Sequence, residues 1–244
     1  MSFVANIVKD RPNDGARVKG TEIRPAANEV NNPANPTGGL DAEGTSGKDE
    51  IRGTNKSDVI RGNDGRDNLN GRARKDVISG EGGSDAIRGG GGNDALFGGD
   101  GNDSIKGGDG KDLITGDRGG DKIMGNKGDD LIVGGEGDDL LRGGQGSDIL
   151  EGGEGADTFL FKGNDFGGKF FEDVIVDFVK GTDILSFESV GSRTFSGMSD
   201  GNDYVISVFN KLNNLAGTIT LNGLGGEAAD MSELTASDIQ SMFG

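Results

Sequence analysis

The sequence predicts an all-β fold, a parallel β-roll of stacked 18-residue coils closed by a C-terminal β-rich cap. A nine-residue period runs from residue 44 to residue 160 without insertion or deletion, and every block carries glycine and one apolar residue at fixed positions. After residue 160 the period stops and phenylalanine becomes frequent. Only 31% of the 244 residues are apolar, which is too few for an ordinary globular core of this length.

Thirteen blocks make up the periodic region. Position one is always glycine, and position four is glycine in all blocks except those with Lys56 and Arg74. Position six is always aspartate: Asp49, Asp58, Asp67, Asp76, Asp85, Asp94, Asp103, Asp112, Asp121, Asp130, Asp139, Asp148 and Asp157. Position eight is always apolar: Ile51, Ile60, Leu69, Ile78, Ile87, Leu96, Ile105, Ile114, Ile123, Ile132, Leu141, Leu150 and Phe159.

Each block divides into a glycine-rich loop and a short strand. Glycine at positions one and four suggests positive φ angles or loops with no room for a Cβ atom. Positions seven to nine alternate polar, apolar and polar, as in a half-buried strand. One apolar residue per block cannot form a core alone, so the blocks are expected to stack as a solenoid. Two strands and two loops per coil place position eight in two facing columns.

The same arithmetic stacks each aspartate over the one 18 residues later, at a strand spacing of about 4.8 Å. Two carboxylates at that distance repel by about 3–4 kcal/mol at an effective dielectric of 20, and by about 1 kcal/mol in bulk water. A divalent cation between neighbouring loops would reverse the sign of this interaction. The ligands on offer are carboxylate and carbonyl oxygens, which suit Ca²⁺ better than Mg²⁺. The chain has no His and no Cys, so the usual zinc and copper sites are excluded.

The block consensus Gly-Gly-x-Gly-x-Asp-x-apolar-x resembles the repeat of the RTX (hemolysin-type) calcium-binding proteins, over all of 44–160. The resemblance implies a right-handed β-roll with one calcium ion between loops two blocks apart. It implies two sets of ligands for each ion. One loop provides its aspartate and the carbonyl groups near positions two and four, and the next loop on that side provides its aspartate and the carbonyl groups near positions one and three. Eleven ions are the upper limit. Besides the thirteen aspartates, the expected site residues are Gly90, Gly92, Gly99, Gly101, Gly108, Gly110, Gly116, Gly119, Gly125, Gly128, Gly134, Gly135, Gly137, Gly143, Gly144, Gly146, Gly152 and Gly155.

The sites are expected to be best from about Gly80 to Asp157. Glycine occupies position two only in later blocks, and Lys56 and Arg74 add positive charge beside two early loops. The first four blocks are therefore expected to be weaker or distorted. The alternative interpretation of the whole tract is disorder, which its low hydrophobicity and high charge favour when calcium is absent.

The flanking segments differ from the repeats. Residues 1–43 are polar and rich in Pro and Asn, and are interpreted as a loosely ordered leader, either a solvated extension or a recognition tail, with at most a short strand at 3–8. No signal-peptide pattern is present at its start. Residues 161–244 are interpreted as a cap that covers the open end of the roll. Strands are expected in or beside it at 158–161, 173–178, 183–187, 204–209 and 218–221.

The end of the chain, residues 231–243, predicts a short helix or turn that starts near Ser232. Its acidic and apolar character resembles a type I secretion signal, although the segment also reads as the end of the cap. The resemblance implies export by type I secretion machinery to an extracellular location.

Composition and motifs exclude several functions. The net charge of −17 leaves no basic face for nucleic acid, and no apolar run is long enough for a transmembrane helix. Residues 197–201 fit the Gly-x-Ser-x-Gly pattern of a serine nucleophile, but a chain without His lacks the base, so we expect a turn there and no catalysis.

The expected function is that of a secreted, non-catalytic calcium-binding protein that folds on meeting extracellular Ca²⁺ and acts at a cell surface, in a matrix or on a host. Weak sites, with Kd values of about 10⁻⁴ to 10⁻³ M, would stay empty in the cytosol. Two alternatives remain, both implied by the resemblance: a secretion and stability module like those of RTX proteases, and a polysaccharide-binding module like those of alginate epimerases.

Overall fold

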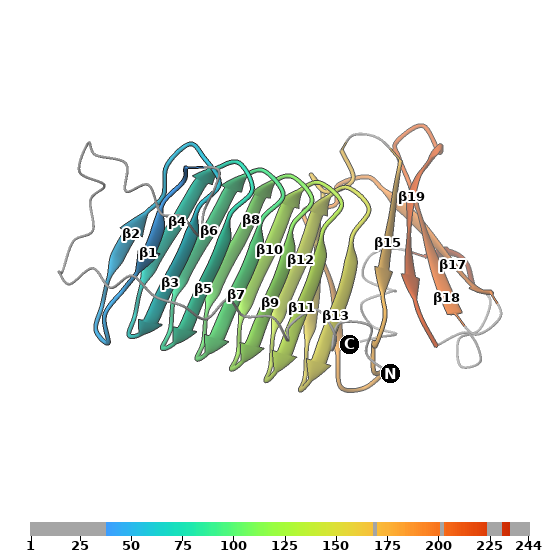
Figure 1. The fold of residues 1–244 in the computed structure, drawn as a ribbon. Coiled ribbons are helices and arrows are strands. Elements are labelled where there is room, and N and C mark those ends of the chain that lie inside the picture. The colour runs from blue at the N-terminus through green and yellow to red at the C-terminus, as the bar shows by residue number, and fades with distance from the viewer. Residues whose placement is uncertain (1–37, 168–169, 201–202, 224–230, 235–244) are drawn as a thin grey trace.

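A computed structural model describes residues 38–167, 170–200, 203–223 and 231–234. These residues form twenty strands in two sheets and contain no helix, so none of them belongs to a helix long and apolar enough to cross a membrane. The predicted all-β solenoid is confirmed, with coils of 18 residues (Figure 1). The strand expected at residues 3–8 lies outside the described residues.

The strands of the roll follow the block period. They are β1 (Asp41–Glu43), β2 (Glu50–Arg52), β3 (Val59–Asp64), β4 (Asn68–Ala73), β5 (Val77–Gly82), β6 (Ala86–Gly91), β7 (Ala95–Asp100), β8 (Ser104–Asp109), β9 (Leu113–Arg118), β10 (Lys122–Lys127), β11 (Leu131–Glu136), β12 (Leu140–Gln145), β13 (Ile149–Glu154) and β14 (Thr158–Lys162). Those of the C-terminal region are β15 (Phe171–Ile175), β16 (Ile184–Glu188), β17 (Thr194–Asp200), β18 (Asp203–Phe209), β19 (Leu215–Leu221) and β20 (Met231–Leu234).

Odd- and even-numbered strands of the roll lie in separate sheets. The first sheet runs in the order β1-β3-β5-β7-β9-β11-β13-β15 before it continues into β19, and the second runs from β2 to β16 through the even strands. Neighbouring strands of the roll are parallel and pair 18 residues apart, as Ile60 with Ile78 shows. The result is the row of coils seen in Figure 1.

The core of the roll lies between the two sheets. All thirteen position-eight residues are at most 1% exposed and form one continuous cluster. Positions seven and nine point away from this core. The two facing apolar columns predicted from the period are therefore present.

The coiling extends beyond the periodic residues at both ends. Before the repeats, Ala42 pairs with Ile60 and is buried, although residues 1–43 were assigned to the leader. After them, Ile175 pairs with Leu150, and Leu185 pairs with Phe159. These last two steps span 25 and 26 residues because insertions separate the strands.

The C-terminal region adds an antiparallel part to the first sheet. β19 pairs in parallel with β15, and β18, β17 and β20 then follow in antiparallel order. All five strands predicted in this region are present, but two local predictions were wrong. Residues 197–200 continue strand β17 where a turn was expected, and Met231–Leu234 forms β20 where a short helix or turn was expected to begin. The rest of the expected helix lies outside the described residues.

Candidate metal centre

The thirteen position-six aspartates lie in two buried columns along the edges of the roll. Each is at most 3% exposed. From Asp49 to Asp139, the backbone N–H of each aspartate donates to Oδ1 of the aspartate 18 residues later, at 2.7–2.9 Å. Every later carboxylate therefore reaches back into the gap below its own coil. The stacking predicted from the period is present.

The second carboxylate oxygen is the distinctive feature of these columns. Oδ2 is buried and has no hydrogen-bond partner in ten consecutive position-six aspartates of the described chain, Asp67, Asp76, Asp85, Asp94, Asp103, Asp112, Asp121, Asp130, Asp139 and Asp148. An unsatisfied buried polar atom costs about 1–3 kcal/mol, and more when it is charged. Ten such atoms in register indicate a missing partner of opposite charge.

Carbonyl oxygens from both sides line the gaps between coils. A Cβ atom on Gly90 would overlap the carbonyl oxygen of Arg72, and one on Gly83 would overlap that of Gly65, so the carbonyl groups of positions two and four point toward the next coil. The carbonyl oxygen of Gly62 points back toward Gly44. Position-three carbonyl oxygens also point back, because the N–H of Gly65 donates to that of Gly82 at 2.6 Å. Each gap thus presents four carbonyl groups besides carboxylate.

A shared loop conformation produces this arrangement in eleven blocks, from residue 62 to residue 160. Positions two and four have positive φ in all of them. At the predicted site glycines in these two positions φ lies between 110° and 142°. Non-glycine residues adopt it as well, at Asn63, Arg72, Glu81, Asp117 and Asn126 in position two and Arg74 in position four, with φ between 70° and 83°.

The first two blocks, 44–52 and 53–61, lack positive φ at these positions. The distortion expected for the first four blocks is therefore confined to two, and Arg74 does not prevent the common loop. The predicted position-one glycines, Gly116, Gly125, Gly134, Gly143 and Gly152, each lie against the carboxylate of their own block, where a Cβ atom would overlap Oδ2. The role of all these residues as ligands stays a prediction.

Burial sets the electrostatics of the columns. Removal from water raises the pKa of Asp130 to about 8, and raises the pKa values of Asp76, Asp121, Asp139 and Asp148 to about 7. Neighbouring acids add to the rise, while the backbone N–H of the preceding aspartate opposes it. Without a cation, the column is therefore an unfavourable place for charge at neutral pH.

Two aspartates beyond the repeats continue the columns and were missed in the sequence. Asp148 N–H donates to Oδ1 of Asp173 at 2.9 Å, and Asp157 N–H donates to Oδ1 of Asp183 at 3.1 Å. Burial and the nearby Asp148 raise the pKa of Asp173 well above its usual value. The signal was the Asp-x-apolar triplet, at 173–175 and again at 183–185, which the insertions had moved out of the nine-residue register.

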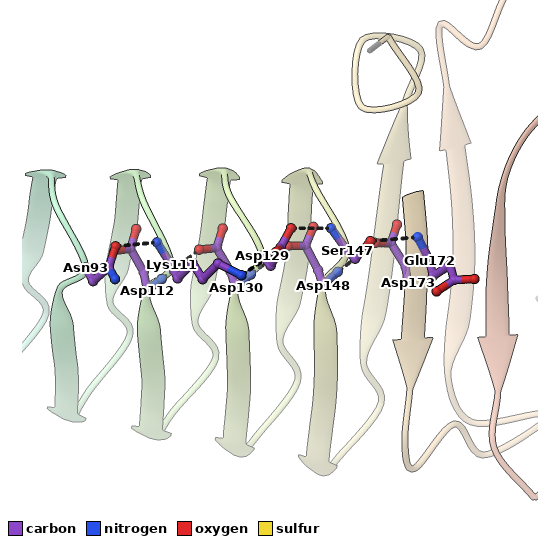
Figure 2. Close-up of polar contacts among 9 residues, drawn as sticks. All are labelled: Asn93, Lys111, Asp112, Asp129, Asp130, Ser147, Asp148, Glu172 and Asp173. Atoms are coloured by element: carbon purple, nitrogen blue, oxygen red, sulfur yellow. Dashed lines mark hydrogen bonds and ion pairs between the residues drawn. The ribbon is translucent and has the colours of Figure 1, made fainter. Parts of the chain in front are cut away.

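Position-five side chains form hydrogen bonds between coils along the outer edges of the roll. Figure 2 shows Asn93 accepting a hydrogen bond from Lys111 N–H at 3.0 Å, and Ser147 Oγ accepting one from Glu172 N–H at 2.9 Å. Between them, Asp129 accepts from Ser147 N–H and pairs with the Lys111 ammonium. These bonds run beside the buried column of Asp112, Asp130, Asp148 and Asp173, so polar contacts between coils separate that column from solvent.

The periodic region matches a sequence model of the RTX calcium-binding nonapeptide repeat (4 copies) at residues 43–73, 62–96, 72–105, 89–123 and 124–159. Residues 43–159 are RTX calcium-binding nonapeptide repeats. Repeats of this family bind calcium, which supports Ca²⁺ as the metal of this region, while the aspartates as its ligands stay a prediction. Among the described residues, no group of three or more Asp, Glu, His or Cys side chains is placed to hold a metal ion by itself.

Two solved structures resemble the fold. The extracellular lipase LipA from Serratia marcescens has 17% identity and a TM-score of 0.39, covering 81% of this chain and 39% of the lipase. The AlgE6R3 subunit of the Azotobacter vinelandii mannuronan C5-epimerase has 26% identity and a TM-score of 0.30, covering 68% of this chain and 77% of the subunit. This chain thus spans well under half of the lipase. No curated protein shows significant similarity to it.

Proposed function

We propose that this RTX protein is a non-catalytic exoprotein that leaves the cell unfolded and folds when extracellular calcium fills the gaps between its coils. The observation that carries the proposal is the run of ten buried Oδ2 atoms without a partner. Ligands must be deprotonated to bind the ion, and the site exists only when the coils are stacked, so binding energy appears as folding energy. The lack of His supports the absence of acid–base catalysis of the serine-hydrolase type.

The loop conformations limit the number of ions. A full cage needs positive φ at positions two and four in both of the loops that face a gap. Eleven consecutive loops meet this condition, and pairing them two apart leaves nine gaps, from Asp67/Asp85 to Asp139/Asp157. We therefore infer nine ions, two fewer than the upper limit of eleven.

The stability of the loaded roll then depends on calcium by mass action. Each ion that binds only the folded state contributes about 2.7 kcal/mol when its free concentration is one hundred times Kd. Sites with Kd values near 10⁻⁴ M, as in extracellular modules, would be empty at cytosolic calcium and filled outside. This difference would keep the chain exportable by type I secretion machinery and fold it afterwards.

A calcium titration of metal-free protein at neutral pH tests the proposal. Far-UV circular dichroism should change from coil to β as calcium rises to millimolar levels, and magnesium at the same concentration should not replace it. A fully β-structured metal-free protein at low salt would contradict the coupling. Export is tested separately by comparing culture supernatants of the full chain and of a chain without its last fifteen residues, and unchanged export of the shorter chain would contradict a C-terminal signal.

A second candidate function, binding of an acidic polysaccharide, is favoured by the outer face of the even-numbered strands. Positions seven and nine of this face include the exposed cations Arg52, Arg88, Lys106 and Lys122, and no acid occupies these positions from β4 to β12. Arg88 and Lys106 are direct partners in neighbouring strands. The equivalent position-seven residues of the odd-numbered strands are apolar, from Val59 to Ile149. A row of cations on an acidic protein complements a linear polyanion.

This candidate is tested on immobilised polyuronate, with neutral dextran as the reference. The loaded wild-type chain should be retained at low salt, and Arg88→Glu/Lys106→Glu should reduce the affinity at least about tenfold, which is the effect of losing about 1.4 kcal/mol. Lys180→Glu/Lys211→Glu is the control, since it makes the same change of charge at exposed positions outside the row. An equal loss of affinity in both variants, or equal retention of the wild-type chain on polyuronate and dextran, would contradict specific binding by the outer face of the even-numbered strands.

A further inference from the structure

The aspartates of the first two loops are satisfied by their own block. The backbone N–H of Thr45 donates to Oδ2 of Asp49 at 2.6 Å, and its hydroxyl donates to the same atom at 2.9 Å. In the next block, Thr54 N–H donates to Oδ2 of Asp58 at 2.6 Å and its hydroxyl to Oδ1 at 2.9 Å. Oδ2, which has no partner in the ten following aspartates, accepts two hydrogen bonds in Asp49 and one in Asp58.

The same threonines redirect a bond that normally joins two coils. In the common loop the position-four N–H donates to a position-three carbonyl oxygen of the next coil, as Gly83 does to Asp100 at 2.7 Å. In the first two loops it donates to the threonine hydroxyl instead, from Gly47 at 3.2 Å and from Lys56 at 3.1 Å. The loop is hydrogen-bonded within itself at these positions, although the carbonyl oxygen of Gly47 still points toward Gly65 of the next coil.

The residue type at position two explains the difference. Threonine is β-branched, and a β-branched residue with positive φ is a conformational outlier. Asn, Arg, Glu and Asp at position two of later blocks do adopt positive φ, so glycine is not required. In addition, the Asn63 side-chain amide donates to the Gly44 carbonyl oxygen at 2.8 Å, which adds a direct hydrogen bond between the first coil and the next.

We infer that Thr45 and Thr54 close the first two loops against calcium, each acting as an internal substitute for an ion. This inference rests on the proposed calcium-dependent folding and names the residues that set where the ion column begins. The gaps Asp49/Asp67 and Asp58/Asp76 are left out of the column, which starts at Asp67/Asp85. The first coil is then held by hydrogen bonds and by the buried side chains of Ile51 and Ile60, without an ion.

Native mass spectrometry of the full chain in millimolar calcium counts the ions directly. Wild type should carry nine. Thr45→Gly and Thr54→Gly should each carry ten, and the double variant eleven, since glycine is the residue at position two of six other blocks. Thr45→Val and Thr54→Val are the matched controls, because valine keeps the β-branched restraint on φ, and they should stay at nine.

The outcomes separate this inference from the proposed function. Eleven ions in wild type, or nine in the double glycine variant, would overturn the closure of the first two loops and leave calcium-dependent folding intact. A wild-type chain that carries no ions would overturn the proposed function itself. Far-UV circular dichroism of the double glycine variant in calcium confirms that the counted species is folded.

Discussion

The roll and the C-terminal region belong to the same two sheets but bury different kinds of side chain. In the roll, each block contributes one buried apolar residue, aliphatic in all blocks but the last, and one buried carboxylate to the stack. In the C-terminal region, the columns end at Asp173, Asp183, Ile175 and Leu185, and a cluster of aromatic rings is added. Phe161 lies 5.5 Å from Phe187 and Phe187 lies 5.2 Å from Phe195, between ring centroids. Phe166 and Phe171 extend the cluster at 5.2 Å.

The difference shows that stacking coils does not by itself determine whether a solenoid needs a ligand. Aromatic side chains bury large apolar areas and need no counter-ion. A roll with one Ile or Leu per nine residues has little apolar area to offset the repulsion within its acid columns. Under the proposed calcium-dependent folding, metal binding stabilises the roll, whereas burial of aromatic rings stabilises the C-terminal region beyond Phe159.

The largest expected effect is that of calcium removal at neutral pH. A chelator should abolish most of the β signal in the far ultraviolet, which comes mainly from the roll. Tyr204, the single tyrosine in a chain without tryptophan, is fully buried in β18 and reports on the C-terminal region alone. Its near-ultraviolet signal should change at lower free calcium than the far-ultraviolet signal does. Coincident transitions would show that the two regions form one cooperative unit.

The next prediction concerns pH in metal-free protein. The folded-state pKa values of the column aspartates are raised to about 6 for Asp67 and about 8 for Asp130. A raised pKa means that the carboxyl groups favour the fold when protonated, so their contribution is full below pH about 3.9, the usual aspartate pKa, and is lost as pH rises through about 6 to 8. Metal-free protein should therefore contain more β-structure at pH 5 than at pH 8.5. A β-structure content that stays constant between pH 5 and pH 8.5, or rises with pH, would contradict the raised pKa values of the column aspartates.

Much of the roll could be predicted because its restraints repeat. Position-six aspartate and position-eight aliphatic residues recur at a fixed spacing, so the coil length, the core columns and the carboxylate columns all follow from counting. Asp173 and Asp183 escaped the count because insertions preceded them, although their Asp-x-apolar triplets are intact. The nine-residue period alone cannot assign a coil whose strands are separated by an insertion of unknown conformation.

The predictions about individual loops were less accurate, for a reason of backbone geometry. Lys56 and Arg74 were expected to distort their loops through charge, yet Arg74 takes a φ of 78° and keeps the common conformation. The residues that set the conformation of the first two loops are Thr45 and Thr54. Their β-branched side chains disfavour positive φ, and their hydroxyl groups donate to the carboxylate of their own block, which a calcium ion would otherwise bind. Strand β17 was missed because a Gly-x-Ser-x-Gly string was interpreted as a turn, whereas residues 197–200 pair in antiparallel register with residues 203–206 of the next strand, β18.

A pair of substitutions sharpens the contrast between the two forces. Asp130→Asn removes a carboxylate that faces two gaps and should lower the free energy of unfolding by about 3–5 kcal/mol at saturating calcium, through the loss of two ions. Phe187→Ala should cost about 3–5 kcal/mol by creating a cavity. Only the first loss should shrink as calcium is lowered. Asp129→Asn is the control, since Asp129 lies next to Asp130 but on the exposed position-five row. A calcium-independent effect of Asp130→Asn would contradict the role given to the column.

The smallest expected effect belongs to the charged pairs on the outside of the coils. Lys127 Nζ lies 2.9 Å from Asp109 Oδ1, joining two successive coils, and both side chains are more than 60% exposed. Water and salt screen such pairs, so Lys127→Ala should change the free energy of unfolding by at most about 1 kcal/mol, and by less at high ionic strength. Thermal or denaturant unfolding in saturating calcium measures it. A loss comparable to that of Asp130→Asn would mean that exposed pairs, and not buried carboxylates with their ions, hold the coils together.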